Sequence, residues 1–255
     1  MKIGQFHDLF KNYNQVQSAE EFDELKYLLG FACRNYNVEL IKIFLSEAIE
    51  NDSKDFTFKI DKTNQTASLF KVNNRNTGEL IIPRTVQHES KDYLITSIIG
   101  INNRVKTLKF AENSSVKTIY ECAFYGPDTE EIYFPASLKE LKEGWCETTE
   151  YLTKIEIPPS NDQFVFKEDK YLLGKSNENN DEFDILLFAR RDIEEISIPP
   201  NVTKICKFAF SSCQNLKKVE IPQDSNLQTI EESAFSDSKI EEIFIPASLK
   251  ELKEE

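Results

Sequence analysis

Few side chains in this 255-residue chain have the types and spacings that catalysis requires. Histidine, the most common general base, occurs only at His7 and His88, and the chain has no glycine-rich phosphate loop, H-E-x-x-H or G-x-S-x-G motif. Acidic pairs such as Glu194-Glu195 and Glu231-Glu232 could act as acid–base dyads, but they recur beside turns and strands, where a solvated face is the simpler interpretation. We therefore expect no enzyme: no catalytic residue, no metal, no cofactor and no small-molecule substrate.

The cysteines are the remaining reactive side chains, and they stand at Cys33, Cys122, Cys146, Cys206 and Cys213. Their number is odd and no C-x-x-C pair occurs, which favours buried thiols in a reducing compartment over a disulfide framework. We interpret them as packed thiols rather than nucleophiles.

Charge and hydropathy exclude several partners. The chain has 31 basic and 44 acidic residues, and 31 − 44 gives a formal net charge of −13. Nucleic acid and anionic lipid both attract basic patches, so neither is expected as a partner. No apolar run approaches the roughly 18 residues of a membrane span, and the first residues lack the apolar stretch of a signal peptide. These two features alone favour a cytoplasmic location.

The elements that must position any binding residue begin with a helical pattern in residues 1–55. Ser18 and Glu21 form a capping box, and two apolar stripes at helical spacing follow it. The stripes are Phe22, Leu25, Leu28, Leu29 and Ala32, then Leu40, Ile41, Phe44, Leu45 and Ala48. We expect two short antiparallel helices near 19–50. The stretch 31–45 resembles the helical pair of an ankyrin repeat, without its threonine-proline-leucine-histidine turn, and a plain helical hairpin explains the pattern equally well.

The rest of the chain, residues 56–255, is a repeat. Apolar residues alternate just before a proline, as in Ile196-Ser197-Ile198-Pro199, and equivalent positions recur every 23 or 24 residues. Residues 135–143 and 246–254 are identical (PASLKELKE). A fixed period in the twenties predicts a leucine-rich type of solenoid, with one short strand per repeat of 23–24 residues. Together with the helical pair, this predicts an α+β protein.

Each repeat has a second half, in which an apolar pair precedes an Ala-Phe corner, as in Val202-Thr203-Lys204-Ile205 before Phe208-Ala209-Phe210. The small alanine lets the return segment approach the strand layer, and the phenylalanine fills the interior of the coil. One spacing, from Ile157 to Ile198, is 41 residues. It predicts a hairpin insertion at about 160–190, with strands at 164–166, 171–173 and 185–188.

The pattern I-x-I-P-x-x-[VL]-x-x-I-x-x-x-A-F, clearest from Ile196 to Phe210, resembles the BspA-like leucine-rich repeat proteins of anaerobic bacteria and parasitic protists. The resemblance covers residues 56–255 and implies a non-catalytic solenoid that binds proteins. For exported members it implies adhesion, a surface-antigen role and a cell-surface location. Several members carry signal sequences or membrane anchors, and this chain shows neither.

Alternation along each strand sends the flanking apolar residues inward and the middle residue outward. Stacked strands should therefore present one ladder of candidate partner-binding residues: Lys109, Tyr133, Glu156, Ser197, Glu220 and Phe244. A second column two residues earlier holds Thr107, Glu131, Lys154, Glu195, Lys218 and Glu242. Tyr133 and Phe244 are the candidate anchors, because aromatic side chains contribute much of the energy of interfaces. The alternative is that such ladders stabilise the sheet by cross-strand pairing alone.

Two functions fit this sequence. The first is a protein-interaction module that binds a host-matrix or cellular protein on its strand-lined face, and the second is an intracellular scaffold or adaptor. The last repeat, which begins at Glu241, reaches residue 255 before its Ala-Phe half. We expect a fragment of a longer array, or an open end that pairs with another chain.

Overall fold

The computed structural model describes residues 49–50, 55–72, 78–101, 105–124, 128–147, 149–177 and 179–253. The chain divides into two compact units, Met1–Glu47 and Ala48–Glu255, and every described residue lies in the second. The helical pair expected near 19–50 lies outside the described residues except for its last two. These two, Ile49–Glu50, form strand β1, which pairs antiparallel with β2 (Phe56–Asp61).

The α+β fold class is wrong for the part of the chain that the structure describes. This part holds twenty strands in four sheets and no helix. The helical expectation fails at Ile49 and Glu50 because they stand opposite Lys59 and Phe58 in an antiparallel ladder. Backbone groups that pair with a neighbouring strand are not available for the hydrogen bonds within a helix.

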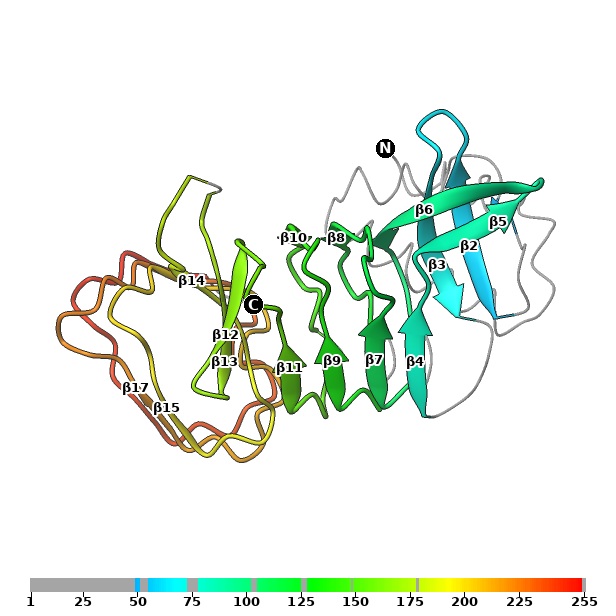
Figure 1. Cartoon of the computed structure of the whole chain (residues 1–255). Coiled ribbons are helices and arrows are strands. Elements are labelled where there is room, and N and C mark those ends of the chain that lie inside the picture. The colour runs from blue at the N-terminus through cyan, green and yellow to red at the C-terminus, as the bar shows by residue number, and fades with distance from the viewer. Residues whose placement is uncertain are drawn as a thin grey trace, which may run out of the picture. The chain divides into compact units, whose positions relative to one another are not determined.

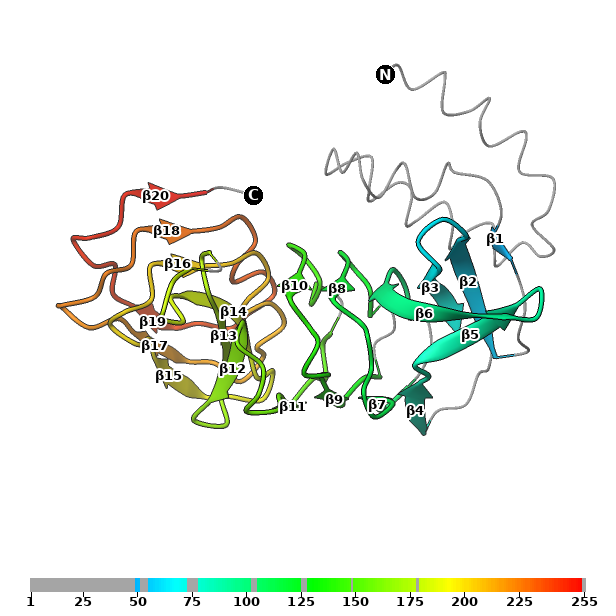
Figure 2. The same cartoon turned by 45° about the horizontal axis from the view of Figure 1, so that its top comes forward.

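The first sheet begins as a mixed sheet and continues into the repeats. Its order is β1-β2-β3-β6-β8-β10, and β5 pairs with β6 (Figure 1; β1 is labelled in Figure 2). Strands β2 and β3 form an antiparallel hairpin, whereas β3, β6, β8 and β10 pair in parallel. The bounds are β3 (Thr66–Val72), β5 (Thr85–His88), β6 (Lys91–Ile98), β8 (Thr118–Ile119) and β10 (Glu140–Leu141).

The second sheet is entirely parallel and has the order β11-β9-β7-β4 (Figure 1). Its strands are β4 (Glu79–Ile82), β7 (Thr107–Phe110), β9 (Glu131–Tyr133) and β11 (Lys154–Glu156). The fourth sheet, also parallel, has the order β15-β17-β19. Its strands are β15 (Glu195–Ser197), β17 (Lys218–Glu220) and β19 (Glu242–Ile243).

A full coil contributes two strands, so the expectation of one strand per repeat is wrong. Strands β16 (Lys204–Ile205), β18 (Thr229–Ile230) and β20 (Glu251–Leu252) stack in parallel opposite β15, β17 and β19 (Figure 2). The chain passes from one layer to the other through a turn after the proline, as where the Val202 N–H donates to the Pro199 carbonyl at 3.0 Å. Because successive coils stack in register, the return segments also form a ladder.

The Ala-Phe corner requires a left-handed backbone. The residue before it has positive φ in four coils: 50° at Cys122, 76° at Gly144, 58° at Phe208 and 54° at Ser233. The N–H that follows then bonds back across a tight turn, as from Ala123 to the Tyr120 carbonyl at 3.2 Å. Only one of the four positions is a glycine, so the corners store backbone strain.

The insertion forms the outer strands of the third sheet, whose order is β12-β13-β14-β16-β18-β20. Its strands are β12 (Phe164–Lys167), β13 (Tyr171–Gly174) and β14 (Ile185–Ala189), and they include the residues expected to be extended. The first two pairings are antiparallel, and β14 then pairs in parallel with β16. The insertion therefore extends the sheet formed by β16, β18 and β20, the second strands of the coils that follow it. We call these coils the second group, and the coils that precede the insertion the first group.

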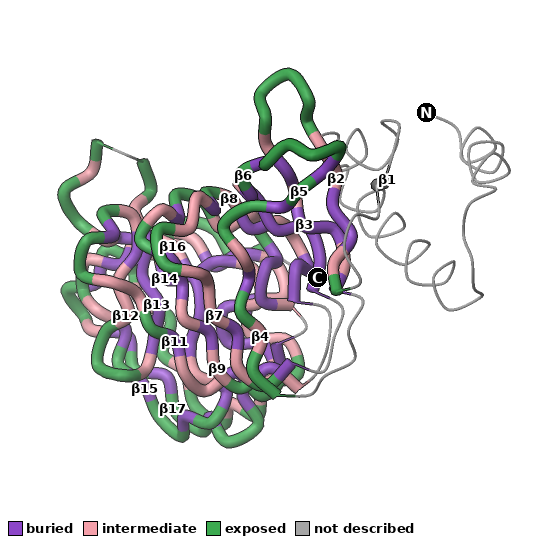
Figure 3. Tube along the Cα trace, turned by 45° about the vertical axis from the view of Figure 1, so that its right-hand side comes forward, coloured by how far each residue is buried: buried purple, intermediate pink, exposed green. Residues whose placement is uncertain are grey.

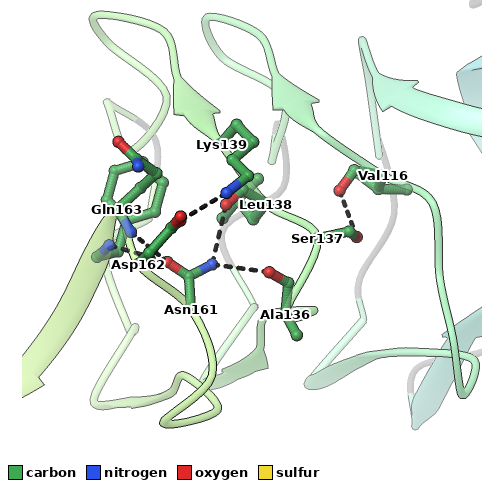
Figure 4. Close-up of polar contacts among 9 residues, drawn as sticks. Val116, Ala136, Ser137, Leu138, Lys139, Asn161, Asp162 and Gln163 are labelled. Atoms are coloured by element: carbon green, nitrogen blue, oxygen red, sulfur yellow. Dashed lines mark hydrogen bonds and ion pairs between the residues drawn. The ribbon is translucent and has the colours of Figure 1, made fainter. Parts of the chain in front are cut away.

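Asn161 closes the first group of coils where the chain leaves for the insertion (Figure 4). It follows Pro158 at the spacing that Leu138 has from Pro135, and its N–H makes the equivalent turn bond at 2.9 Å. Its side-chain amide donates to the carbonyls of Ala136 (3.3 Å) and Leu138 (2.9 Å). Its side-chain oxygen accepts from the N–H groups of residues 163 and 164, both at 2.9 Å. A buried polar side chain thus replaces the apolar one and is satisfied.

Buried residues recur along the coils (Figure 3), and their side chains pack against one another. They form two clusters, one centred on the first group of coils and the β2–β3 region, the other on the second group. The insertion contributes side chains to both clusters, and the first cluster also includes Cys206. Trp145, which is 2% exposed, is the centre of an aromatic group and lies 5.9 Å from Phe124, 5.7 Å from Phe134 and 5.8 Å from Phe188 between ring centroids.

Arg191 connects the two groups of coils. Its guanidinium is buried and donates to the carbonyl oxygens of Thr149 (3.1 Å) and Cys146 (3.2 Å) before the insertion. It also donates to the carbonyl oxygens of Ala209 (3.0 Å) and Phe208 (3.2 Å) after the insertion. Its charge lies 4.5 Å from the centroid of the Phe188 ring on β14. One side chain therefore bonds to segments that are about 60 residues apart.

Candidate partner-binding face

The first three predicted ladder residues lie side by side on the second sheet. Tyr133 on β9 stands opposite Glu156 on β11. On the other side of β9, Leu108 of β7 stands opposite Ile132, so the next residues along these parallel strands, Lys109 and Tyr133, are neighbours. Lys109 and Tyr133 are half-buried, whereas Glu156 is exposed. We call this set the first ladder.

Tyr133 is held between two lysines. Its hydroxyl donates to Glu131 Oε2 at 2.9 Å and accepts from Lys154 Nζ at 2.6 Å. The ammonium groups of Lys109 and Lys154 lie 5.2 Å and 4.8 Å from its ring centroid, within the range of cation–π attraction. These are the contacts of cross-strand pairing.

The charged residues of the first ladder are paired with neighbouring side chains. Lys109 bonds to Glu79, and Lys154 forms ion pairs with Glu156 at 3.1 Å and Glu131 at 3.8 Å. The hydrogen bond to Glu79 raises the pKa of Lys109, and the hydrogen bond to Tyr133 is the largest cause of the raised pKa of Lys154. This surface has little unbalanced charge to offer a partner.

The other three predicted residues, the second ladder, lie on the fourth sheet. Ser197 on β15 stands opposite Glu220 on β17, and Phe244 follows β19 directly. All three are exposed, and Phe244 has 64% of its surface accessible. Among the described residues, no ion pair involves Glu220 or the column residues Glu195 and Glu242.

The structure does not bring all six residues into one ladder. Strand β11 ends the second sheet and β15 begins the fourth, and the two strands do not pair. The insertion between Ile157 and Ile198 is the reason, because the chain makes a hairpin before the next coil starts. The sequence showed the irregular spacing but could not show that it divides the ladder.

The described cysteines are buried and unpaired. Burial raises the pKa of Cys146 to about 11 and that of Cys206 to about 12, and it also raises the pKa of Cys122 and Cys213. A thiol must lose its proton to act as a nucleophile or a metal ligand, and burial disfavours the thiolate at all four positions. Among the residues the structure describes, no group of three or more histidine, cysteine or acidic side chains could hold a metal ion.

A groove that the sequence analysis missed lies beside Ser197. It has a volume of about 470 Å³ and runs between the insertion and the end of β15. Its apolar lining is Tyr171, Leu173, Phe183, Ile198, Pro199 and Pro200, and its polar lining is Lys167, Glu168, Glu182, Ser197 and Asn201. No sequence motif indicates it, because it forms only where the hairpin packs beside the coil.

The parallel strand layers, the turn after each proline and the repeated left-handed corner define a solenoid of leucine-rich repeats. The model for the BspA-type leucine-rich repeat region matches residues 99–171 and 182–255 in six copies. The chain belongs to this family, as its repeat pattern indicated. The family consists in general of non-enzymatic repeat proteins.

Several solved structures of bacterial proteins are similar to this chain. A leucine-rich repeat protein of Eubacterium ventriosum is 17% identical and has a TM-score of 0.49, with 78% of this chain and 66% of that chain covered. A leucine-rich cell surface protein of Faecalibacterium prausnitzii is 16% identical, with a TM-score of 0.31 and coverages of 73% and 76%. The pneumococcal vaccine antigen PcpA is 16% identical, with a TM-score of 0.34 and coverages of 80% and 72%. No curated protein matches this chain.

The described residues contain no helix that is long and apolar enough to span a membrane.

Proposed function

We propose that this chain is a non-catalytic protein-interaction module that binds a protein partner on its strand-lined face. The observation that carries this proposal is the second ladder. Short parallel strands hold Ser197, Glu220 and Phe244 on one exposed surface, and among the described residues no ion pair involves the Glu220 carboxylate. A rigid surface of this kind loses little conformational entropy when it binds, which favours affinity.

Phe244 is the principal anchor in this proposal. It is 64% exposed, and covering an aromatic side chain of this size contributes strongly to an interface. Tyr133 is a secondary anchor, because a partner must compete with its contacts to Glu131 and Lys154. The second ladder therefore contributes more to binding than the first.

Membership of the BspA-type family supports adhesion to a host-matrix protein, or a surface-antigen role, as the biological setting of this binding. The alternative is an intracellular scaffold or adaptor. It is favoured by the four unpaired thiols among the described residues, because reducing compartments keep thiols free.

Binding to purified extracellular-matrix proteins, measured by biolayer interferometry, tests the proposal. The variants are Phe244→Ser, Tyr133→Ser and the control Tyr151→Ser, which removes an aromatic side chain that is 55% exposed and outside both ladders. We expect a matrix protein to bind the wild-type chain, and Phe244→Ser to weaken that binding about tenfold or more, as loss of an aromatic anchor does. Tyr133→Ser should weaken it less, and Tyr151→Ser should leave it unchanged.

Equal losses in Phe244→Ser and Tyr151→Ser would refute the ladder as the binding face. If no matrix protein binds, the same variants are applied to proteins crosslinked from lysate of the source cell. A partner that Phe244→Ser loses there would support the scaffold alternative.

A further inference from the structure

The two copies of the sequence PASLKELKE, residues 135–143 and 246–254, make the same backbone contacts where the structure describes both. In each copy the leucine three residues after the proline donates its N–H to the proline carbonyl, at 3.2 Å in both. The next lysine donates its N–H to the preceding coil, at 2.8 Å in the first copy and 2.9 Å in the second. Contacts made by the first copy therefore indicate what the second copy can bind.

A strand and a turn, residues 154–162, adjoin the first copy. Strand β11 pairs in parallel with β9, and the Phe134 N–H donates to the Glu156 carbonyl at 2.9 Å. Phe134 is 2% exposed, and Leu138 within the copy is fully buried. The strand-and-turn segment thus satisfies backbone groups at a position where the apolar side chains are buried.

Two polar side chains attach the turn to the first copy (Figure 4). The Asn161 amide donates to the carbonyls of Ala136 and Leu138, at 3.3 Å and 2.9 Å. Asp162 Oδ1 forms an ion pair with Lys139 Nζ at 2.5 Å. An asparagine three residues after the proline, followed by an acidic residue, is therefore the pair of side chains with which the segment binds this sequence.

The second copy presents the same groups on an open surface, residues 245–252, which we call the second-copy surface. Among the described residues, no strand pairs with the second edge of β19. No described residue donates to the carbonyls of Ala247 and Leu249 or accepts from the Ile245 N–H. Ile245 is 54% exposed, whereas its counterpart Phe134 is 2% exposed. Every group that binds the segment in the first copy is thus available here.

We propose that the second-copy surface binds a strand-and-turn segment of leucine-rich repeat type, with the features of residues 154–162, on a different polypeptide. The strand pairs in parallel with β19, and the asparagine of the turn donates to the carbonyls of Ala247 and Leu249. The acidic residue pairs with Lys250, which is exposed and donates to the neutral Gln228 side chain at 3.0 Å.

The occupant is a different polypeptide because in a second copy of this chain residues 154–162 already contact residues 136–139. The inference goes beyond the proposed function, since it concerns the edge of a coil and not the strand-lined face. It depends on neither Ser197 nor Glu220.

Nuclear magnetic resonance titration of the isotope-labelled full chain with a peptide of residues 153–164 tests the proposal. We expect the amide signals of residues 243–252 to shift. The peptide with Asn161→Ala should bind roughly fivefold to tenfold more weakly, because it lacks two hydrogen bonds. The control peptide with Ser160→Ala should bind as the original does, since Ser160 is exposed in the chain.

Two variants of the chain change the same lysine of the two identical sequences, so their net charges are equal. Lys250→Glu should weaken binding of the original peptide roughly threefold or more, as loss of one exposed ion pair allows. Lys139→Glu should leave it unchanged, because Lys139 pairs with Asp162 of its own chain. A peptide with Asp162→Lys should bind the Lys250→Glu chain more tightly than the wild-type chain.

Equal affinities of the original and Asn161→Ala peptides, or equal effects of Lys250→Glu and Lys139→Glu, would overturn the proposal. Absence of shifts, or shifts at residues 135–141 alone, would do the same. Analytical ultracentrifugation of the chain without peptide tests the other occupant. A dimer that Lys250→Glu dissociates would assign the second-copy surface to a second copy of the chain, against the proposal.

Discussion

Replacing Arg191 with methionine tests whether this one side chain holds the two groups of coils together. The substitution keeps a long side chain in a buried position but removes every hydrogen bond of the guanidinium. The neighbouring Arg190 is a matched control. It is more exposed and pairs on the surface with Asp169 at 2.6 Å and Asp192 at 2.7 Å.

The expected loss of stability depends on whether each carbonyl that Arg191 contacts keeps another hydrogen-bond donor. The carbonyls of Cys146, Phe208 and Ala209 each retain a backbone donor, namely the N–H groups of residues 149, 211 and 189. The Thr149 carbonyl has only the guanidinium as a hydrogen-bond donor among the described contacts. Leaving it unsatisfied costs roughly 1–3 kcal/mol, and loss of the cation–π contact with Phe188 adds about 1 kcal/mol. We therefore expect Arg191→Met to lower the free energy of unfolding by roughly 2–4 kcal/mol, against about 0–1 kcal/mol for Arg190→Met.

Urea denaturation followed by tryptophan fluorescence measures this difference. Trp145 is the single tryptophan of the chain and lies 5.8 Å from Phe188, the ring on which Arg191 stacks. Its fluorescence emission therefore reports unfolding at the place where Arg191 connects the two groups of coils, and far-ultraviolet circular dichroism reports loss of the strands. If the two variants differ by less than 1 kcal/mol, the reasoning is refuted, since the desolvation of the buried guanidinium would then offset its hydrogen bonds.

Two further predictions concern the corners and the thiols. Gly144→Ala should lower the free energy of unfolding by about 1 kcal/mol, because alanine at φ 76° is strained, whereas Ser233→Gly should relieve strain at φ 54° and leave stability equal or higher. Thermal or urea unfolding checks both, and a loss of stability in Ser233→Gly would contradict the strain argument. For the thiols, the folded pKa lies above the unfolded value of about 8.5, and is about 11 at Cys146 and about 12 at Cys206. Stability from these groups is complete below about pH 8.5 and falls as pH rises toward 11, because only the unfolded chain releases the protons. Urea midpoints across this range check the slope, and a Cys146→Ala variant whose pH dependence equals that of the wild type would count against it.

The repeat could be predicted from local pattern because each coil uses the same short-range devices. A proline turn, two inward apolar residues and an Ala-Phe corner recur within 23 or 24 residues, and each is readable without knowing the rest of the chain. The outward direction of Ser197, Glu220 and Glu156 follows from alternation along a single strand, and the structure leaves these residues exposed. The left-handed corner was missed because three of its four residues are not glycine, so composition gave no signal.

Other features depend on which segments meet. The second strand of each coil is two residues long in β16, β18 and β20, too short for a pattern to indicate, and it forms because neighbouring coils stack in register. Tyr133 was predicted as a candidate anchor from its outward position alone, and only the structure shows the two lysines from adjacent strands that contact its ring. In the column beside the second ladder, Lys218 stands opposite both Glu195 and Glu242, but among the described residues no ion pair involves either carboxylate.

The sequence by itself determined the family, the period and the residues that each strand turns outward, because these depend on interactions within one or two repeats. Only the tertiary structure decided that β11 and β15 belong to different sheets, that Arg191 bonds to segments on both sides of the insertion and that a groove lies beside Ser197. Each of these arises where the hairpin of residues 164–189 packs against coils distant in sequence. Long-range packing of this kind leaves no periodic trace in a single chain.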